Sequence, residues 1–168
     1  NGGPSTTVVN ESDGLWDVQA DVGFDNADSA TFTNAGTLRK SGGAGTTTLG
    51  PTFNNTGTVQ ANSGTLSFGG LFQQTGGQTL LSGGNVTFAQ PAQLRGGTLG
   101  GTGTITGSVS NNATVSPGAS PGLLTITGSY PEGPNAHLQI ELGGTTPGTG
   151  YDQLSVGGTG AEVEVDTE

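Results

Sequence analysis

Residues 101–130 read GTGTITGSVSNNATVSPGASPGLLTITGSY, and within them the five letters TITGS occur twice, starting at Thr104 and at Thr125. The two copies are offset by 21 residues, and Gly, Asn, Ser and Pro dominate the sequence between them. A short alternation of apolar and polar residues that returns at a fixed distance indicates a chain built from stacked structural repeats.

Similar stretches occur along much of the chain, at residues 45–49, 64–68, 84–88, 103–107 and 124–128. Their starts lie 19 to 21 residues apart. Neighbouring residues of a strand point to opposite faces, so the middle residue of each stretch is expected to face inward and its mostly Thr or Ser neighbours outward. The predicted inward column contains Thr47, Leu66, Val86, Ile105 and Ile126.

Two further families of short segments divide each repeat into three strands. One family has the form Gly-Thr-Leu, at residues 36–38, 57–59, 97–99 and 113–115, with 77–80 fitting less well. The other carries the large apolar residues Phe32, Phe53, Phe72, Leu94, Val109 and Tyr130. The corner residues Asn34, Asn55 and Asn112 are expected to bond neighbouring coils. Three short strands per turn of about 20 residues predict an all-β chain folded as a parallel β-helix, a solenoid of about seven or eight coils.

The composition agrees with such a fold and limits the partners. The 168 residues favour one domain, and a hydrophobic content of only 29% suits a thin core shared along a stack. The formal net charge is −10, with Arg39, Lys40 and Arg95 as the only basic residues. This balance excludes nucleic acid as a partner and disfavours an anionic membrane surface. We expect no membrane insertion, because no apolar run has the length of a membrane span.

Residues 94–130 contain a G-x-G-x-I/V segment, an Asn-rich corner and the run PGASPGL at 117–123. Together with the run LQIELGGTTPGTGYDQLSV at 138–156, they resemble the passenger-associated repeats of Gram-negative autotransporters and related large bacterial surface adhesins. The resemblance implies a right-handed parallel β-helix, an extracellular or bacterial cell-surface location and an adhesive or stalk role. It implies no single activity, because this fold carries many.

Three segments are expected along the chain. Residues 1–29 form an N-terminal capping or linking segment, residues 30–150 the β-helix repeats, and residues 151–168 further strands. The last of these includes the alternation AEVEV at 161–165, and we expect it to continue in a longer parent chain or to pair with another subunit. Open ends of this kind favour head-to-tail association.

The sequence offers no convincing catalytic group. His137 is the only histidine, and its alternation with Leu138 and Ile140 predicts an outward position. Outward carboxylates are almost missing from residues 30–130, which leaves no pair for acid–base chemistry. We therefore expect no enzyme, no catalytic residue and no cofactor.

Acidic residues gather near both ends of the chain. The N-terminal group comprises Asp13, Asp17, Asp21, Asp25 and Asp28. Its spacing matches no calcium-binding loop, so a solvated acidic cap is expected and no metal site is assigned, although calcium stays an open alternative. The C-terminal group, on one face of a strand, comprises Glu162, Glu164, Asp166 and Glu168.

The outward neighbours of the inward column predict a ladder of hydroxyl groups. Its members are Thr46, Thr48, Thr65, Ser67, Thr87, Thr104, Thr106, Thr125 and Thr127, with Asn85 interrupting the pattern. Arrays of the form Thr-x-Thr resemble the faces of ice-binding solenoids. Thr is also a good strand former with a soluble side chain, so a plain solvated sheet face is the other interpretation.

A structural role, as a surface-displayed or secreted stalk or adhesin segment, is the function these patterns favour. Three alternatives stay open: a subunit of an extracellular filament joined through solenoid ends, a polysaccharide-binding or polysaccharide-active β-helix, and an ice-binding ladder. The expected partners are accordingly other protein subunits, end to end, or a host or surface polysaccharide.

Overall fold

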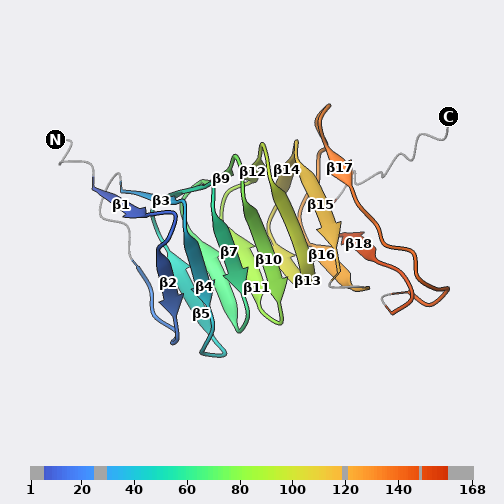
Figure 1. Ribbon diagram of the computed structural model, residues 1–168, viewed down its shortest axis with the longest axis horizontal. Coiled ribbons are helices and arrows are strands. Elements are labelled where there is room, and N and C mark those ends of the chain that lie inside the picture. The colour runs from blue at the N-terminus through green and yellow to red at the C-terminus, as the bar shows by residue number, and fades with distance from the viewer. Residues whose placement is uncertain (1–5, 25–29, 119–120, 148, 159–168) are drawn as a thin grey trace.

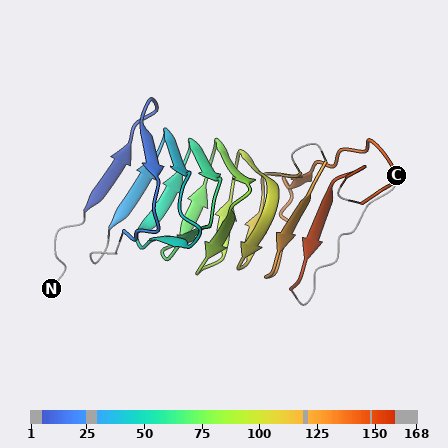
Figure 2. The same ribbon diagram turned by 90° about the horizontal axis from the view of Figure 1, so that it is seen from below.

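A computed structural model describes residues 6–24, 30–118, 121–147 and 149–158. Within these ranges the chain is all-β, without a helix, and forms a parallel β-solenoid of about six turns with about 20 residues per turn (Figure 1). The turns follow one another along the long axis, with the N-terminal turn at one end (Figure 2). The predicted fold class is therefore confirmed.

Three parallel sheets, A, B and C, form the walls of the solenoid, and most turns contribute one strand to each sheet. Sheet A contains β1 (Thr7–Asn10), β3 (Thr31–Asn34), β6 (Thr52–Asn55), β9 (Phe72–Gln74), β12 (Ala92–Leu94) and β14 (Val109–Asn111). Sheet B contains β2 (Leu15–Val18), β4 (Thr37–Lys40), β7 (Thr58–Ala61), β10 (Gln78–Ser82), the first half of β13 (Thr98–Thr106), β15 (Thr114–Pro117) and β17 (His137–Leu138). Sheet C contains β5 (Thr46–Leu49), β8 (Thr65–Phe68), β11 (Asn85–Phe88), the second half of β13, β16 (Leu123–Ile126) and β18 (Gln153–Val156).

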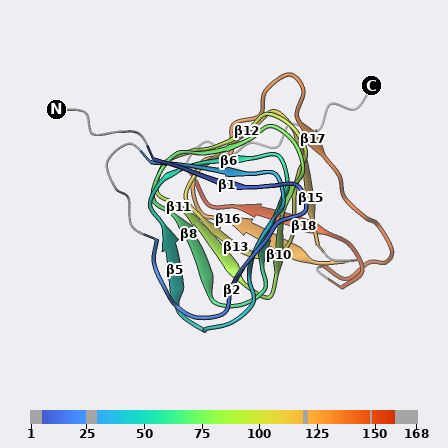
Figure 3. The same ribbon diagram turned by 60° about the vertical axis from the view of Figure 1, so that its left-hand side comes forward.

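The number of turns is smaller than the seven or eight expected. Between β17 and β18 the chain leaves the stack (Figure 3) and returns only at Gln153. These residues form bends and isolated bridges, such as the antiparallel bridge between Leu142 and Tyr151, in place of another turn. At the other end, regular pairing starts before residue 30, because β1 pairs with β3 and β2 pairs with β4. The predicted strand at 161–165 lies outside the described residues.

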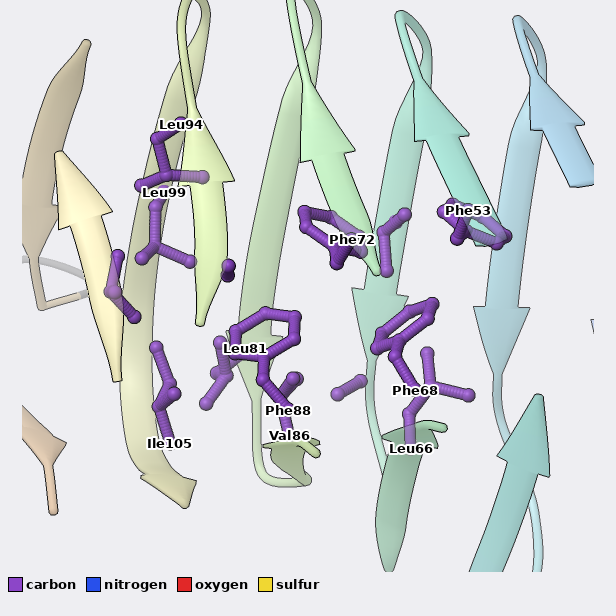
Figure 4. Close-up of a cluster of buried hydrophobic side chains, with 14 of the residues drawn as sticks. Phe53, Leu66, Phe68, Phe72, Leu81, Val86, Phe88, Leu94, Leu99 and Ile105 are labelled. Atoms are coloured by element: carbon purple, nitrogen blue, oxygen red, sulfur yellow. The ribbon is translucent and has the colours of Figure 1, made fainter. Parts of the chain in front are cut away.

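The predicted inward column of sheet C is confirmed residue by residue. Thr47 pairs with Leu66, Leu66 with Val86, Val86 with Ile105 and Ile105 with Ile126. All five side chains are buried. Leu66, Val86 and Ile105 lie along the core in the close-up (Figure 4). Each coil thus adds one residue to a column that excludes water from the axis of the solenoid.

A stack of aromatic rings fills the core behind sheet A. The rings of Phe32 and Phe53 stack with centroids 5.0 Å apart, and those of Phe53 and Phe72 stack at 5.7 Å. The prediction that Leu94 continues this column is wrong, because Ala92 is the residue in register with Val109, while Leu94 pairs with Asn111. Ala92 is small, so a search for large apolar residues selects Leu94 and misses the register by two positions.

A buried amide ladder runs along the corner between sheets A and B. Asn10 donates to Asn34 at 2.7 Å, Asn34 to Asn55 at 2.8 Å, and Asn55 to the Gln74 side chain at 3.2 Å. The predicted role of Asn34 and Asn55 is confirmed. Asn112 also bonds the next coil, since its side-chain oxygen accepts the Asn135 N–H at 3.0 Å, but its neighbour Asn111 is the residue that stands in this column. These bonds satisfy side chains that would be costly to bury unpaired.

Leu94 interrupts the ladder, and a different cluster completes it. Asn111 donates to the Tyr130 hydroxyl at 2.8 Å. Burial, and then the neighbouring Glu132, raise the pKa of Tyr130 well above its usual value, so its hydroxyl stays neutral. The ladder therefore consists of two hydrogen-bonded segments separated by one apolar side chain.

Candidate functional site

The outer face of sheet C carries two columns of polar side chains, which we call the hydroxyl face. In one column, Thr46 pairs with Thr65, Thr65 with Asn85, and Thr104 with Thr125. In the other, Thr48 pairs with Ser67, Ser67 with Thr87, and Thr87 with Thr106. The backbone thus brings eight of the nine residues of the predicted ladder onto one side of the molecule, and the ninth, Thr127, directly follows β16.

The spacing of this face follows from its strands. Neighbouring strands lie about 4.8 Å apart, and residues two apart on one strand are separated by roughly 6.6 Å. Thr46, Thr48 and Thr106 are exposed, while Thr65, Ser67 and others are half-buried by their neighbours. The result is a shallow, regular grid of hydroxyl groups, not a cleft.

Two members of the face are engaged in bonds between coils. The side-chain oxygen of Asn85 accepts the Thr104 N–H at 2.9 Å, and the Thr127 hydroxyl accepts the Gly107 N–H at 3.2 Å. Asn85 therefore interrupts the hydroxyl column but supports the adjoining coil. Part of the face is committed to holding the solenoid together, and the remaining hydroxyls are available to solvent or to a ligand.

No charged residue occurs in the described strands of sheet C. The hydroxyl face can therefore donate and accept hydrogen bonds, but it carries no acid, base or activated nucleophile. It suits a neutral, repetitive ligand surface, since it offers neither charge nor depth for a small polar molecule.

Two further ionisable residues, His137 and Asp152, lie away from this face. His137 is exposed on β17 in sheet B, which confirms its outward position. Asp152 is buried, and its carboxylate accepts the Gly122 N–H and the Glu141 N–H, each at 2.9 Å. Asp152 thus joins the corner before β16 to the segment that leaves the stack. Nothing in the sequence around Asp152 signals this structural role.

The described acidic residues near the N terminus have mixed environments. Asp17 forms an ion pair with Arg39, and Asp21 with Lys40, whereas Asp13 is exposed. Asp25 and Asp28 lie outside the described residues, as do the four acids of the C-terminal group. Within the described part of the chain, no group of three His, Cys, Asp or Glu side chains is placed to hold a metal ion.

Comparison with protein-family models, with curated proteins and with solved structures finds no match for this chain. Its resemblance to autotransporter and adhesin repeats therefore stays a prediction. The described residues include no helix long and apolar enough to cross a membrane.

Proposed function

We propose that this chain is a non-catalytic structural spacer, a stalk or adhesin segment of a secreted or surface-displayed protein. The observation that carries the proposal is the continuous in-register pairing of parallel strands around one core, from β1 with β3 to β16 with β18. Such a stack has a constant cross-section and is extended by adding repeats. Its function is to hold the parts of the protein that adjoin its two ends at a fixed distance from each other.

The length of the spacer follows from the pairing. Strands about 4.8 Å apart and about six turns give a rod of roughly 30 Å. Hydrogen bonds between coils run along the rod, and the aromatic stack of Phe32, Phe53 and Phe72 follows the same direction. Bending the rod would strain both, which supports stiffness.

Duplication of one repeat tests the spacer. A second copy of residues 53–71 places Phe53 where Phe72 now follows Leu71, so the core columns stay in register. Small-angle scattering should give a rod longer by about one strand spacing, roughly 5 Å, with cooperative unfolding retained. A matched variant that duplicates only residues 53–62 breaks the register and should fold poorly. Unchanged length, or equal folding of both variants, would contradict a modular spacer.

A surface location is supported by the resemblance of residues 94–130 to surface-protein repeats and by the net charge of −10, which favours solubility. Antibodies raised against the rod should label intact source cells or their medium. Labelling only after lysis would contradict this part of the proposal.

The hydroxyl face favours a second candidate function, binding to a regular neutral surface such as ice. The specific observation is the alignment of Thr87 with Thr106 and of Thr104 with Thr125 on adjacent coils. Inhibition of ice recrystallisation is the direct assay. It should be lost in Thr106→Lys and kept in Thr58→Lys on sheet B, a position outside the face. Absence of inhibition in the unmodified chain would leave this face as a solvated wall.

Activity on polysaccharides and assembly into filaments each have a direct test. A polysaccharide-active protein would release products from glycans, and release that disappears in His137→Ala or Asp152→Asn would overturn the structural proposal. A filament subunit would form assemblies whose mass increases with protein concentration. If light scattering gives the molar mass of a monomer throughout a concentration range, the filament alternative is contradicted.

A further inference from the structure

Both ion pairs of the described residues join the first coil, residues 7–24, to the second. The carboxylate of Asp17 accepts from Arg39 Nε at 3.1 Å and from Arg39 Nη2 at 2.9 Å. Asp21 Oδ1 lies 2.8 Å from Lys40 Nζ. The contacts between the later coils in the described ranges are hydrogen bonds and apolar packing. Within the described residues, ion pairs therefore contribute to the stability of the junction between the first and second coils and not to that of the later junctions.

Lys40 is the unusual member of this junction because its side chain is completely buried. It occupies a core position, paired with Val18 on one side and Ala61 on the other. Its ammonium bonds to Asp21 and to the Gly42 carbonyl oxygen at 2.9 Å. Removing the one opposite charge would leave a buried cation without compensation, which is strongly destabilising. That opposite charge belongs to the first coil.

Apolar packing holds the first coil less firmly than it holds the inner coils. Trp16 packs edge-on against Phe32, with ring centroids 5.1 Å apart, yet it stays 37% exposed because no coil covers its other side within the described residues. Leu15 and Val22 are 58% and 56% exposed. Terminal units with fewer buried contacts are the first to open in a stacked fold.

We propose that the first coil is an acid-released cap: protonation of Asp17 and Asp21 detaches residues 7–24 as a unit while the remaining coils stay folded. Detachment uncovers one edge of β3 and of β4 together with the ring of Phe32. Unpaired parallel edges beside an apolar end are able to accept another coil, so acid would switch the rod from a capped end to an adhesive one.

The direction of the pH effect follows from the neighbours of the two carboxyl groups. Hydrogen bonds from Arg39, Gln19 and Ser41 hold the pKa of Asp17 far below its usual 3.8. The Lys40 ammonium, and then the Gly45 N–H, lower the pKa of Asp21. Both groups therefore contribute stability that is fully present above pH 3.8 and is lost as the pH falls through their lower folded values. The cap stays closed at neutral pH and opens only in acid.

Trp16 makes the release measurable, since it is the only tryptophan of the chain and lies in the cap. An acid titration should give a red shift of tryptophan emission at a higher pH than the loss of the β signal in circular dichroism. The two changes should each be reversible. Coincidence of the two transitions would overturn the proposal, because the cap would then leave only with the whole fold.

Substitutions separate charge from general damage. The double variant Asp17→Asn/Asp21→Asn imitates protonation and should show the red-shifted emission at neutral pH with the β signal retained. Asp13→Asn, an exposed carboxylate of the same coil, should behave like the unmodified chain. Equal behaviour of the double variant and Asp13→Asn would refute the proposal.

A further variant tests the proposal even if the double variant does not fold. Lys40→Met removes the buried charge, so protonation of Asp21 no longer leaves an uncompensated cation. Its two acid transitions should lie closer together than in the unmodified chain. An unchanged interval between them would show that the ion pair at Lys40 does not control the cap.

Discussion

Asn34 donates its side-chain amide to Asn55 in the next coil at 2.8 Å, and the same amide nitrogen also lies 3.0 Å from the Thr58 carbonyl oxygen. Both asparagines are buried. The bond therefore links two coils at a corner where the backbone turns away from the sheet ladders. The same bond is formed from Asn10 to Asn34, and from Asn55 to Gln74, so the corner is one hydrogen-bonded column from Asn10 to Gln74.

Asn55→Ala should lower the free energy of unfolding by about 2–3 kcal/mol, because it removes two buried hydrogen bonds between coils, the one that Asn55 accepts from Asn34 and the one that it donates to Gln74. Chemical denaturation measures the change. Asn54→Ala, the outward neighbour on β6, is the matched control and should change stability by less than about 0.5 kcal/mol. Similar losses in both would mean that the ladder does not stabilise the stack.

Ile105→Asp should be far more damaging than Thr104→Asp. Ile105 is completely buried, so the substitution places an unpaired carboxylate in the core at a cost of several kcal/mol. Thr104 is half-buried on the hydroxyl face, and its change should cost roughly 1 kcal/mol. Thermal unfolding compares them, and equal destabilisation would contradict the inward and outward assignment of β13.

Gly77→Ala should destabilise the chain by about 1–3 kcal/mol, since Gly77 has a φ of 62° and a Cβ there would overlap the Gly57 carbonyl of the previous coil. Gly69→Ala is the control, because its added Cβ would meet the neighbouring coil at an ordinary 3.5 Å. Denaturant midpoints measure both. A tolerated Gly77→Ala would mean that this corner can relax.

Asp152→Asn should lower stability by about 1–3 kcal/mol, because the amide can accept only one of the two backbone N–H bonds and turns a donor toward the other. Hydrogen exchange should increase at Gly122 and Glu141, the two donors. Unchanged exchange at both amides would indicate that Asp152 does not tie the departing segment to the stack.

The strand columns were predictable from sequence because a period of two residues, repeated about every 20, leaves little freedom in which side chains face inward. The aromatic column from Phe32 to Phe72 and the column through Ile105 follow from that rule. The rule failed at Leu94, because the small Ala92 stands in the column of the Phe rings and Leu94 stands in the column of Gln74 and Asn111. Where a small residue takes the place of a ring, the spacing of large apolar residues does not reveal the register.

The first coil and Asp152 escaped prediction for a different reason. Residues 7–18 lack the Gly-Thr signature of the later repeats, so the partnership of Asp17 with Arg39 could not be read from a matching pattern. Asp152 acts on amides 30 and 11 residues away through a segment that leaves the stack. The hydroxyl face, by contrast, was predictable because each member is the sequence neighbour of an inward residue of the sheet C column.

The passage of β13 from sheet B into sheet C has a consequence for how such a chain can vary. At this corner Thr98–Thr106 runs on as one strand, whereas in the second coil residues 41–45 separate β4 from β5. The same corner therefore tolerates both a loop and no loop without disturbing the columns on either side. Length differences can accumulate there, and an inserted peptide or whole domain would be displayed from the rod beside the hydroxyl face while the core beneath it stayed unchanged.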